Sequence, residues 1–132
     1  MFGLLFGRKW LLGDRSRFGR WGERTSYRYL RGKGLRLVCR NYSCRGGEID
    51  IVMADGCGGL VFVEVKTRSS EEMADAEDAV DFPKRQKLIR AARYFLSKYG
   101  DAERSCRFDV VAVVLGESGP VEIRHYENAF VP

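Results

Sequence analysis

The sequence has no apolar run of the length that a membrane-spanning helix requires, which is about 20 residues. Arg8 and Lys9 interrupt the apolar N-terminal stretch, and no basic region precedes it as in a secretory signal peptide. We therefore expect a cytoplasmic protein in which residues 1–13 form a loosely ordered N-terminal extension. Contact of this extension with a membrane surface is an open alternative.

Histidine is nearly absent, and the few cysteines form no metal-binding pattern. The spacing of Cys39, Cys44, Cys57 and Cys106 matches no zinc site, and the single histidine, His125, is remote from them in sequence. We expect free thiols in a reducing compartment, with His125 as a surface or packing residue of the last strand. Structural zinc and histidine-based catalysis are both disfavoured.

Acidic residues are scarce in the first third of the chain. Residues 1–45 contain 12 Lys and Arg against 2 acids, whereas residues 46–132 contain 11 against 16, which together give the net charge of +5. A basic surface attracts phosphate backbones through counterion release, without sequence preference. The basic segment of residues 1–45 therefore favours a nucleic-acid partner, although a solvated basic face is an equal alternative.

The acids that follow lie on an expected β-hairpin. Two apolar runs, residues 49–54 and 60–65, flank the glycine-rich turn at residues 55–59. One face would carry Val52, Ala54, Leu60 and Phe62, and the other Ile49, Ile51, Met53, Val61, Val63 and Val65. A hairpin that is apolar on both faces belongs in the middle of a sheet covered by helices.

The register of this hairpin predicts a charged cluster. If Cys57 is at the centre of the turn, Asp50 lies opposite Glu64 and Glu48 opposite Lys66, all on one face. Opposed carboxylates destabilise a sheet unless they share a partner, and Mg²⁺ or Mn²⁺ prefers oxygen ligands of this kind. The alternative is a simple cross-strand ion pair between Glu48 and Lys66.

Asp50, followed after thirteen residues by Glu64-Val65-Lys66, resembles the signature of the PD-(D/E)xK nuclease superfamily, which has the restriction-endonuclease-like fold. Ile49 stands where the superfamily name has proline, a position that carries no chemistry. A longer ordered set resembles the bacterial YraN-like family, which is similar to archaeal Holliday-junction resolvases. That set comprises Gly22-Glu23, Tyr29-Leu30, Arg40-Asn41, residues 47–50, residues 61–68 and residues 107–111.

The resemblance implies a function for each matching residue. Asp50, Glu64 and the Val65 carbonyl would bind Mg²⁺ or Mn²⁺, and Lys66 would orient or deprotonate the attacking water. Glu23 would complete the metal site or hold its water. Further candidates for nucleic-acid binding are Arg68, Arg45, Arg40 and Gln86. The implied substrate is branched or single-stranded DNA, and similar junction nucleases suggest a homodimer.

The remaining pattern predicts an α/β domain over residues 14–132 with the order α-β-β-β-α-β-β. The first helix would be capped by Ser16 and end near Arg31, and Gly19 and Gly22 indicate either a close backbone approach or a later start of the helix. The second would be capped by Asp81, with Pro83 in its first turn, and end at Gly100. Single strands are expected at residues 35–41, 107–115 and 121–126, and the acidic segment 69–81 as a mobile loop or loose helix.

These features leave three functions open. The first is metal-dependent hydrolysis of phosphodiester bonds by the acidic hairpin. The second is a nucleic-acid-binding module that has the same basic half but no catalysis. The third is an interaction protein whose apolar N-terminus docks on a larger assembly.

Overall fold

The computed structural model describes residues 2–69, 82–100 and 104–130, without the side chains of residues 2–6. The elements are α1 (Phe2–Leu12), α2 (Arg15–Gly32), β1 (Arg36–Cys44), β2 (Gly47–Ala54), β3 (Leu60–Ser69), α3 (Phe82–Tyr99), β4 (Cys106–Leu115) and β5 (Glu122–Phe130). The predicted acidic segment and the predicted cap Asp81 lie outside the described residues, apart from Ser69 at the end of β3.

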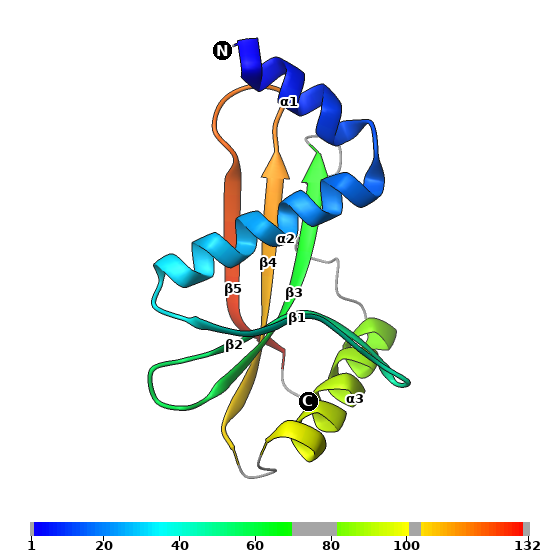
Figure 1. The fold of residues 1–132 in the computed structure, drawn as a ribbon, viewed down its shortest axis with the longest axis vertical. Coiled ribbons are helices and arrows are strands. Elements are labelled where there is room, and N and C mark those ends of the chain that lie inside the picture. The colour runs from blue at the N-terminus through cyan, green and yellow to red at the C-terminus, as the bar shows by residue number, and fades with distance from the viewer. Residues whose placement is uncertain (1, 70–81, 101–103, 131–132) are drawn as a thin grey trace.

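The sheet has five strands in the order β1-β2-β3-β4-β5. β3 and β4 are parallel, and the other neighbours are antiparallel. Because parallel neighbours need a crossover connection, α3 lies between β3 and β4 in the chain. This mixed sheet flanked by helices is consistent with the expected restriction-endonuclease-like fold (Figure 1).

Helices cover both faces of the sheet, as the apolar hairpin predicts. On one face, α3 contributes Leu88, Ile89, Ala91, Ala92 and Phe95 to a core shared with Val52, Leu60 and Phe62. On the other face, Leu30 of α2 packs with Met53, Val61, Val63, Val111 and Val113. Both layers of this core meet the central strands β2, β3 and β4, so these strands are fixed from two sides.

The N-terminal segment differs from its expected loose conformation, because residues 2–12 form α1. Arg17 attaches α1 to α2: its Nε donates to the Trp10 carbonyl over 2.8 Å, and its guanidinium lies 4.1 Å from the centre of the Trp10 ring. Asp14, and not Ser16, caps α2 by accepting from the Arg17 backbone N–H. None of the helices in the described part of the chain is long and apolar enough to span a membrane.

The predicted hairpin register is confirmed, since Ala54 pairs with Leu60. The β2–β3 ladder ends, however, at the pair Ile51–Val63. The expected pairs Asp50–Glu64 and Glu48–Lys66 lie beyond it, where β2 has left β3. Ile49, expected on the α2 side, packs in the core under α3 because the alternation of faces is broken at this point.

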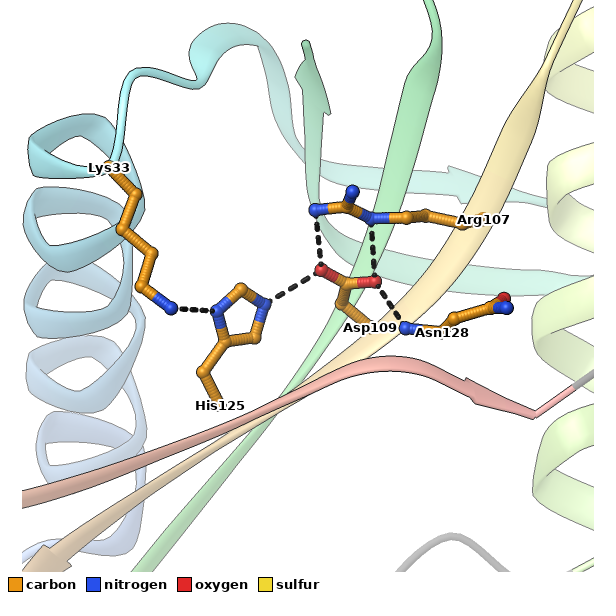
Figure 2. A network of polar contacts seen from close by, with 5 residues as sticks. All are labelled: Lys33, Arg107, Asp109, His125 and Asn128. Atoms are coloured by element: carbon orange, nitrogen blue, oxygen red, sulfur yellow. Dashed lines mark hydrogen bonds and ion pairs between the residues drawn. The ribbon is translucent and has the colours of Figure 1, made fainter.

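A buried polar cluster links β4, β5 and the end of α2 (Figure 2). Asp109 accepts from Arg107 Nε at 3.1 Å, from Arg107 Nη2 at 3.2 Å and from the Asn128 backbone N–H at 3.0 Å, and it pairs with His125 Nε2 at 2.7 Å. The other ring nitrogen of His125 lies 3.0 Å from Lys33 Nζ. His125 is therefore a packing residue of β5, as predicted, and its role here is to fix the edge strand.

Candidate active site

The candidate site begins where β2 separates from β3. Beyond the last ladder pair, the backbone N–H of Val65 donates to the side chain of a β2 residue, the Asp50 carboxylate, whose Oδ2 accepts it over 2.8 Å. β1 is the strand on the other side of β2. Its residue Asn41 lies between the two residues that pair with Ile49 and Ile51. Its φ of 51° is in the left-handed region. The distorted backbone thus flanks Asp50 directly.

Glu64 extends from β3 into the same region and receives two lysines. Lys66 Nζ lies 3.4 Å and Lys84 Nζ 2.7 Å from Glu64 Oε1. Lys66 follows Glu64 by two residues and shares its side of β3. Lys84 comes from the first turn of α3, so the Glu64 carboxylate joins the sheet to the helix.

Glu23 completes the acidic side from α2. Gly22 brings α2 close to β3: a Cβ on Gly22 would lie 2.0 Å from Thr67 Oγ1, so only glycine fits here. Burial raises the pKa of Glu23, and the nearby Glu48 and Glu64 raise it further. A hydrogen bond from the Asn41 side chain acts in the opposite direction. The close approach expected at Gly22 is confirmed, whereas a Cβ on Gly19 would meet nothing within 4 Å.

The pKa shifts indicate that one carboxylate of the site, that of Asp50, is not compensated by nearby positive charge. Burial and the neighbouring Glu64 raise the pKa of Asp50 to about 7, although the Val65 N–H opposes the shift. Burial and the nearby Lys84 lower the pKa of Lys66 to about 8, although Glu64 opposes the shift. Burial opposes ionisation of Lys84 as well, but the contact with Glu64 outweighs it and raises the Lys84 pKa.

These groups line a cleft of about 870 Å³ between α2, the β1–β2 turn and the start of α3. Its acidic wall consists of Glu23, Glu48, Asp50 and Glu64, and its basic residues are Arg45, Lys84 and Lys87. The cleft therefore places carboxylates and cations side by side, as a phosphodiester with a bridging divalent cation requires.

The oxygen donors suit Mg²⁺ or Mn²⁺ in type. Asp50 and Glu64 are carboxylates, and the raised pKa of Asp50 indicates that a cation would stabilise its ionised form. Over the described part of the chain, however, no three His, Cys, Asp or Glu side chains are grouped closely enough to form a metal centre by themselves. Any cation would thus also need backbone oxygen, water or substrate as ligands.

The predicted site residues are distributed as follows. Five of them line the cleft: Glu23, Arg45, Asp50, Glu64 and Val65. Lys66 is not a lining residue, but it contacts Glu64, which is. The other three predicted nucleic-acid contacts, Arg40, Arg68 and Gln86, are not among its lining residues. Arg40 lies 4.3 Å over the Tyr27 ring, and Arg68 donates to the Thr67 carbonyl over 3.0 Å.

The central part of the chain matches a known family. The family model described as "Uncharacterised protein family UPF0102" matches residues 22–113, which carry the acidic hairpin, α3 and the later part of α2. The chain belongs to the UPF0102 family, also known as the YraN family.

Three relatives named only as UPF0102 proteins illustrate how far the likeness extends. The protein of Pelotomaculum thermopropionicum is 43% identical over 88% of this chain and 97% of its own length. That of Pseudomonas fluorescens is 43% identical over 89% and 97%, and that of Moorella thermoacetica 50% identical over 76% and 83%. The UPF0102 assignment therefore covers nearly the full length of the first two relatives, while their names give no activity.

Sequence reasoning about this UPF0102 chain did not include Lys84 in the site. Gln86 was the predicted contact from α3, yet Lys84 precedes the buried Leu88 by four residues, and so it lies on the same face of the helix. Gln86 is not among the residues that line the cleft. The apolar stripe of α3 was therefore the signal that could have identified Lys84.

Proposed function

We propose that this UPF0102 protein is a metal-dependent endonuclease that hydrolyses phosphodiester bonds in DNA. The proposal is carried by one observation: the half-buried carboxylate of Asp50, the buried carboxylate of Glu64 and the buried Lys66 meet where β2 leaves β3, at a cleft with basic residues. Strained or distorted backbone next to ionisable groups with shifted pKa values is typical of active sites. The proposed substrates are branched or single-stranded DNA, in the cytoplasm.

In this proposal Asp50, Glu64 and the Val65 carbonyl would hold Mg²⁺ or Mn²⁺. The cation would lower the pKa of a bound water and stabilise negative charge on the phosphate oxygens. Lys66, whose pKa is about 8, would accept the proton of the attacking water in its neutral amine form, or would orient that water as the ammonium. The water oxygen forms a bond to phosphorus, the bond from phosphorus to the leaving sugar oxygen breaks, and that oxygen takes a proton from solvent.

Other residues orient these groups. The Val65 N–H fixes one oxygen of Asp50, so the second oxygen is directed by a rigid strand. Glu23 is held near the same carboxylates by the close packing at Gly22, where it would orient a water. Arg45 and Lys87 would bind the phosphate backbone along the cleft.

A cleavage assay tests the proposal. We expect Mg²⁺- or Mn²⁺-dependent cleavage within a labelled panel of linear, flapped, single-stranded and four-way-junction DNA. Asp50→Ala and Lys66→Ala should each reduce the rate by at least about 100-fold, the scale of losing a positioned acid–base or charge-stabilising group. Arg93→Ala, a charge removal on α3 outside the cleft lining, serves as the control that keeps wild-type activity.

The second candidate is a non-catalytic nucleic-acid-binding module, also possible as a homodimer. It is favoured by the lack of a three-carboxylate centre among the described residues and by the lysines that already neutralise Glu64. In that case no DNA in the panel is cut, while salt-sensitive binding persists in both site variants.

A further inference from the structure

Lys84 is placed in the cleft by the packing of α3 against the start of β2. The contact is close: a Cβ on Gly47 would lie 2.8 Å from the Lys87 carbonyl oxygen, and one on Gly46 would lie 3.2 Å from Arg90 Cβ. A glycine in the β1–β2 turn and the first residue of β2, also glycine, thus allow the helix to approach β2 at this point. Since the helix axis is fixed here, Lys84, one turn before Leu88, is directed at Glu64.

The two lysines on Glu64 differ in their freedom. The Lys66 side chain is 6% exposed and belongs to a central strand, so its ammonium has little room to move. The Lys84 side chain is 43% exposed, on a flexible four-carbon stem that reaches from the first turn of α3. Lys84 can therefore change its position by rotation of its own side chain, whereas Lys66 is enclosed by the sheet.

A divalent cation on Glu64 and the Lys84 ammonium exclude one another for two reasons. Both require the same carboxylate, and both are positive, so their repulsion across a few ångströms in a half-buried site is large. Lys66 is subject to the same repulsion but is enclosed. A cation that binds Asp50 and Glu64 therefore displaces Lys84 into the open part of the cleft.

The open part of the cleft has the chemistry of a phosphate site. Lys87 lies one turn along α3 from Lys84 and, like Arg45, is a cleft-lining cation. A displaced Lys84 adds a third positive charge to this wall. A phosphate oxygen is the group that three neighbouring cations would bind.

We propose that Lys84 is a phosphate-binding residue that Glu64 holds in the metal-free protein and that a divalent cation releases onto nucleic acid. This inference rests on the proposed nuclease site. It assigns Lys84 two positions: on Glu64 without the cation, and on a DNA phosphate with it. Binding of the cation and binding of DNA are then coupled through one side chain.

Metal affinity is the first test, with Mn²⁺ alone as the probe and calorimetry or the free-Mn²⁺ resonance signal as the readout. Lys84→Met keeps the stem and removes the charge, so it should bind Mn²⁺ about tenfold more tightly, a typical size for one coupling between sites. Lys84→Arg should stay near wild type because it can keep the pair with Glu64. Lys87→Met, which removes a charge one turn away, is the matched control and should change Mn²⁺ affinity less than about twofold.

DNA affinity is the second test, measured with a cleavage-resistant phosphorothioate single strand, with and without Mn²⁺. With Mn²⁺, Lys84→Met should lose more affinity than Lys87→Met, by roughly three- to tenfold. Without Mn²⁺ the loss in Lys84→Met should not exceed that in Lys87→Met, because Lys84 is then engaged by Glu64. A merely structural ion pair would lower thermal stability and leave this dependence on Mn²⁺ absent.

The outcomes separate this inference from the proposed function. Unchanged Mn²⁺ affinity in Lys84→Met, or a DNA loss that is the same with and without Mn²⁺, overturns the role of Lys84 even if the wild type cuts DNA. The expected pattern in a wild type that cuts no DNA supports Lys84 and overturns the nuclease. Lys84→Gln replaces Lys84→Met in both tests if the methionine variant does not fold.

Discussion

At the residue scale, Asp50 and Asp109 are two carboxylates of the sheet whose surroundings shift their pKa values in opposite directions. Asp109 accepts from Arg107, His125 and the Asn128 N–H, and these donors outweigh burial and lower its pKa. Asp50 receives one backbone N–H and lies near other acids, so its pKa is raised. A carboxylate with a raised pKa is typical of functional sites, and we expect a bound cation to stabilise the ionised form of Asp50.

The first residue-scale prediction concerns Asp50→Asn. The folded pKa of Asp50 is about 7 against an ordinary value of 3.8, so the folded state binds more protons and loses stability as the pH rises across that interval. Asparagine removes this loss, and the variant should be more stable than wild type at pH 8 by roughly 1–3 kcal/mol. At pH 4 the two should unfold at similar urea concentrations.

Urea unfolding at pH 4, 6 and 8 measures the effect, with Asp109→Asn as the control. Asp109 has a lowered pKa, so its contribution is present above the ordinary value of 3.8 and is lost as the pH falls through the folded pKa. Asp109→Asn should therefore destabilise the protein at pH 8. An Asp50→Asn variant less stable than wild type at pH 8 would contradict the assignment of Asp50 as an uncompensated carboxylate.

At the element scale, the sequence predicts the sheet better than it predicts the point where β2 separates from β3. The glycine-rich turn and the period of two set the Ala54–Leu60 register, and the apolar faces place both helices. The end of the ladder at Ile51–Val63 and the left-handed Asn41 of β1 are not encoded in the alternation of apolar residues. The approach of Lys84 to Glu64 depends likewise on glycines in another element.

The close packing of α2 on β3 gives the element-scale prediction. Gly22→Ala should destabilise the protein by about 2 kcal/mol, because the added Cβ overlaps Thr67 and overpacking of this kind costs about 1–3 kcal/mol. The overlap outweighs the gain of about 1 kcal/mol that alanine brings to a helix interior. Guanidinium or urea unfolding at pH 7 measures the difference.

Gly19→Ala is the matched control, one turn earlier on the same helix. A Cβ at Gly19 meets nothing within 4 Å, so only the helix propensity changes, and the variant should be more stable by up to about 1 kcal/mol. Equal effects of the two substitutions would mean that α2 does not approach β3 as closely as Gly22 requires.

At the scale of the whole molecule, residues from the basic and the acidic parts of the sequence together form a cleft with acidic and basic walls. The basic half of the chain supplies Arg45, and also Glu23, one of its two acids. The later, acidic half supplies the carboxylates of the hairpin together with Lys84 and Lys87 of α3. Net charge by segment therefore predicts a nucleic-acid partner but not the location of the contact, because the fold mixes residues from both halves in one site.

The last prediction tests this cleft as the path of nucleic acid. Arg45→Glu should weaken DNA binding several-fold and lower the slope of log affinity against log salt by about 1, because one phosphate contact with its released counterion is lost. Arg93→Glu makes the same charge change on α3, outside the cleft lining, and should leave the slope unchanged. Fluorescence anisotropy across a salt series measures both. Equal slopes for the two variants would mean that DNA binding responds to net charge alone, and would contradict the prediction that the cleft is the binding surface.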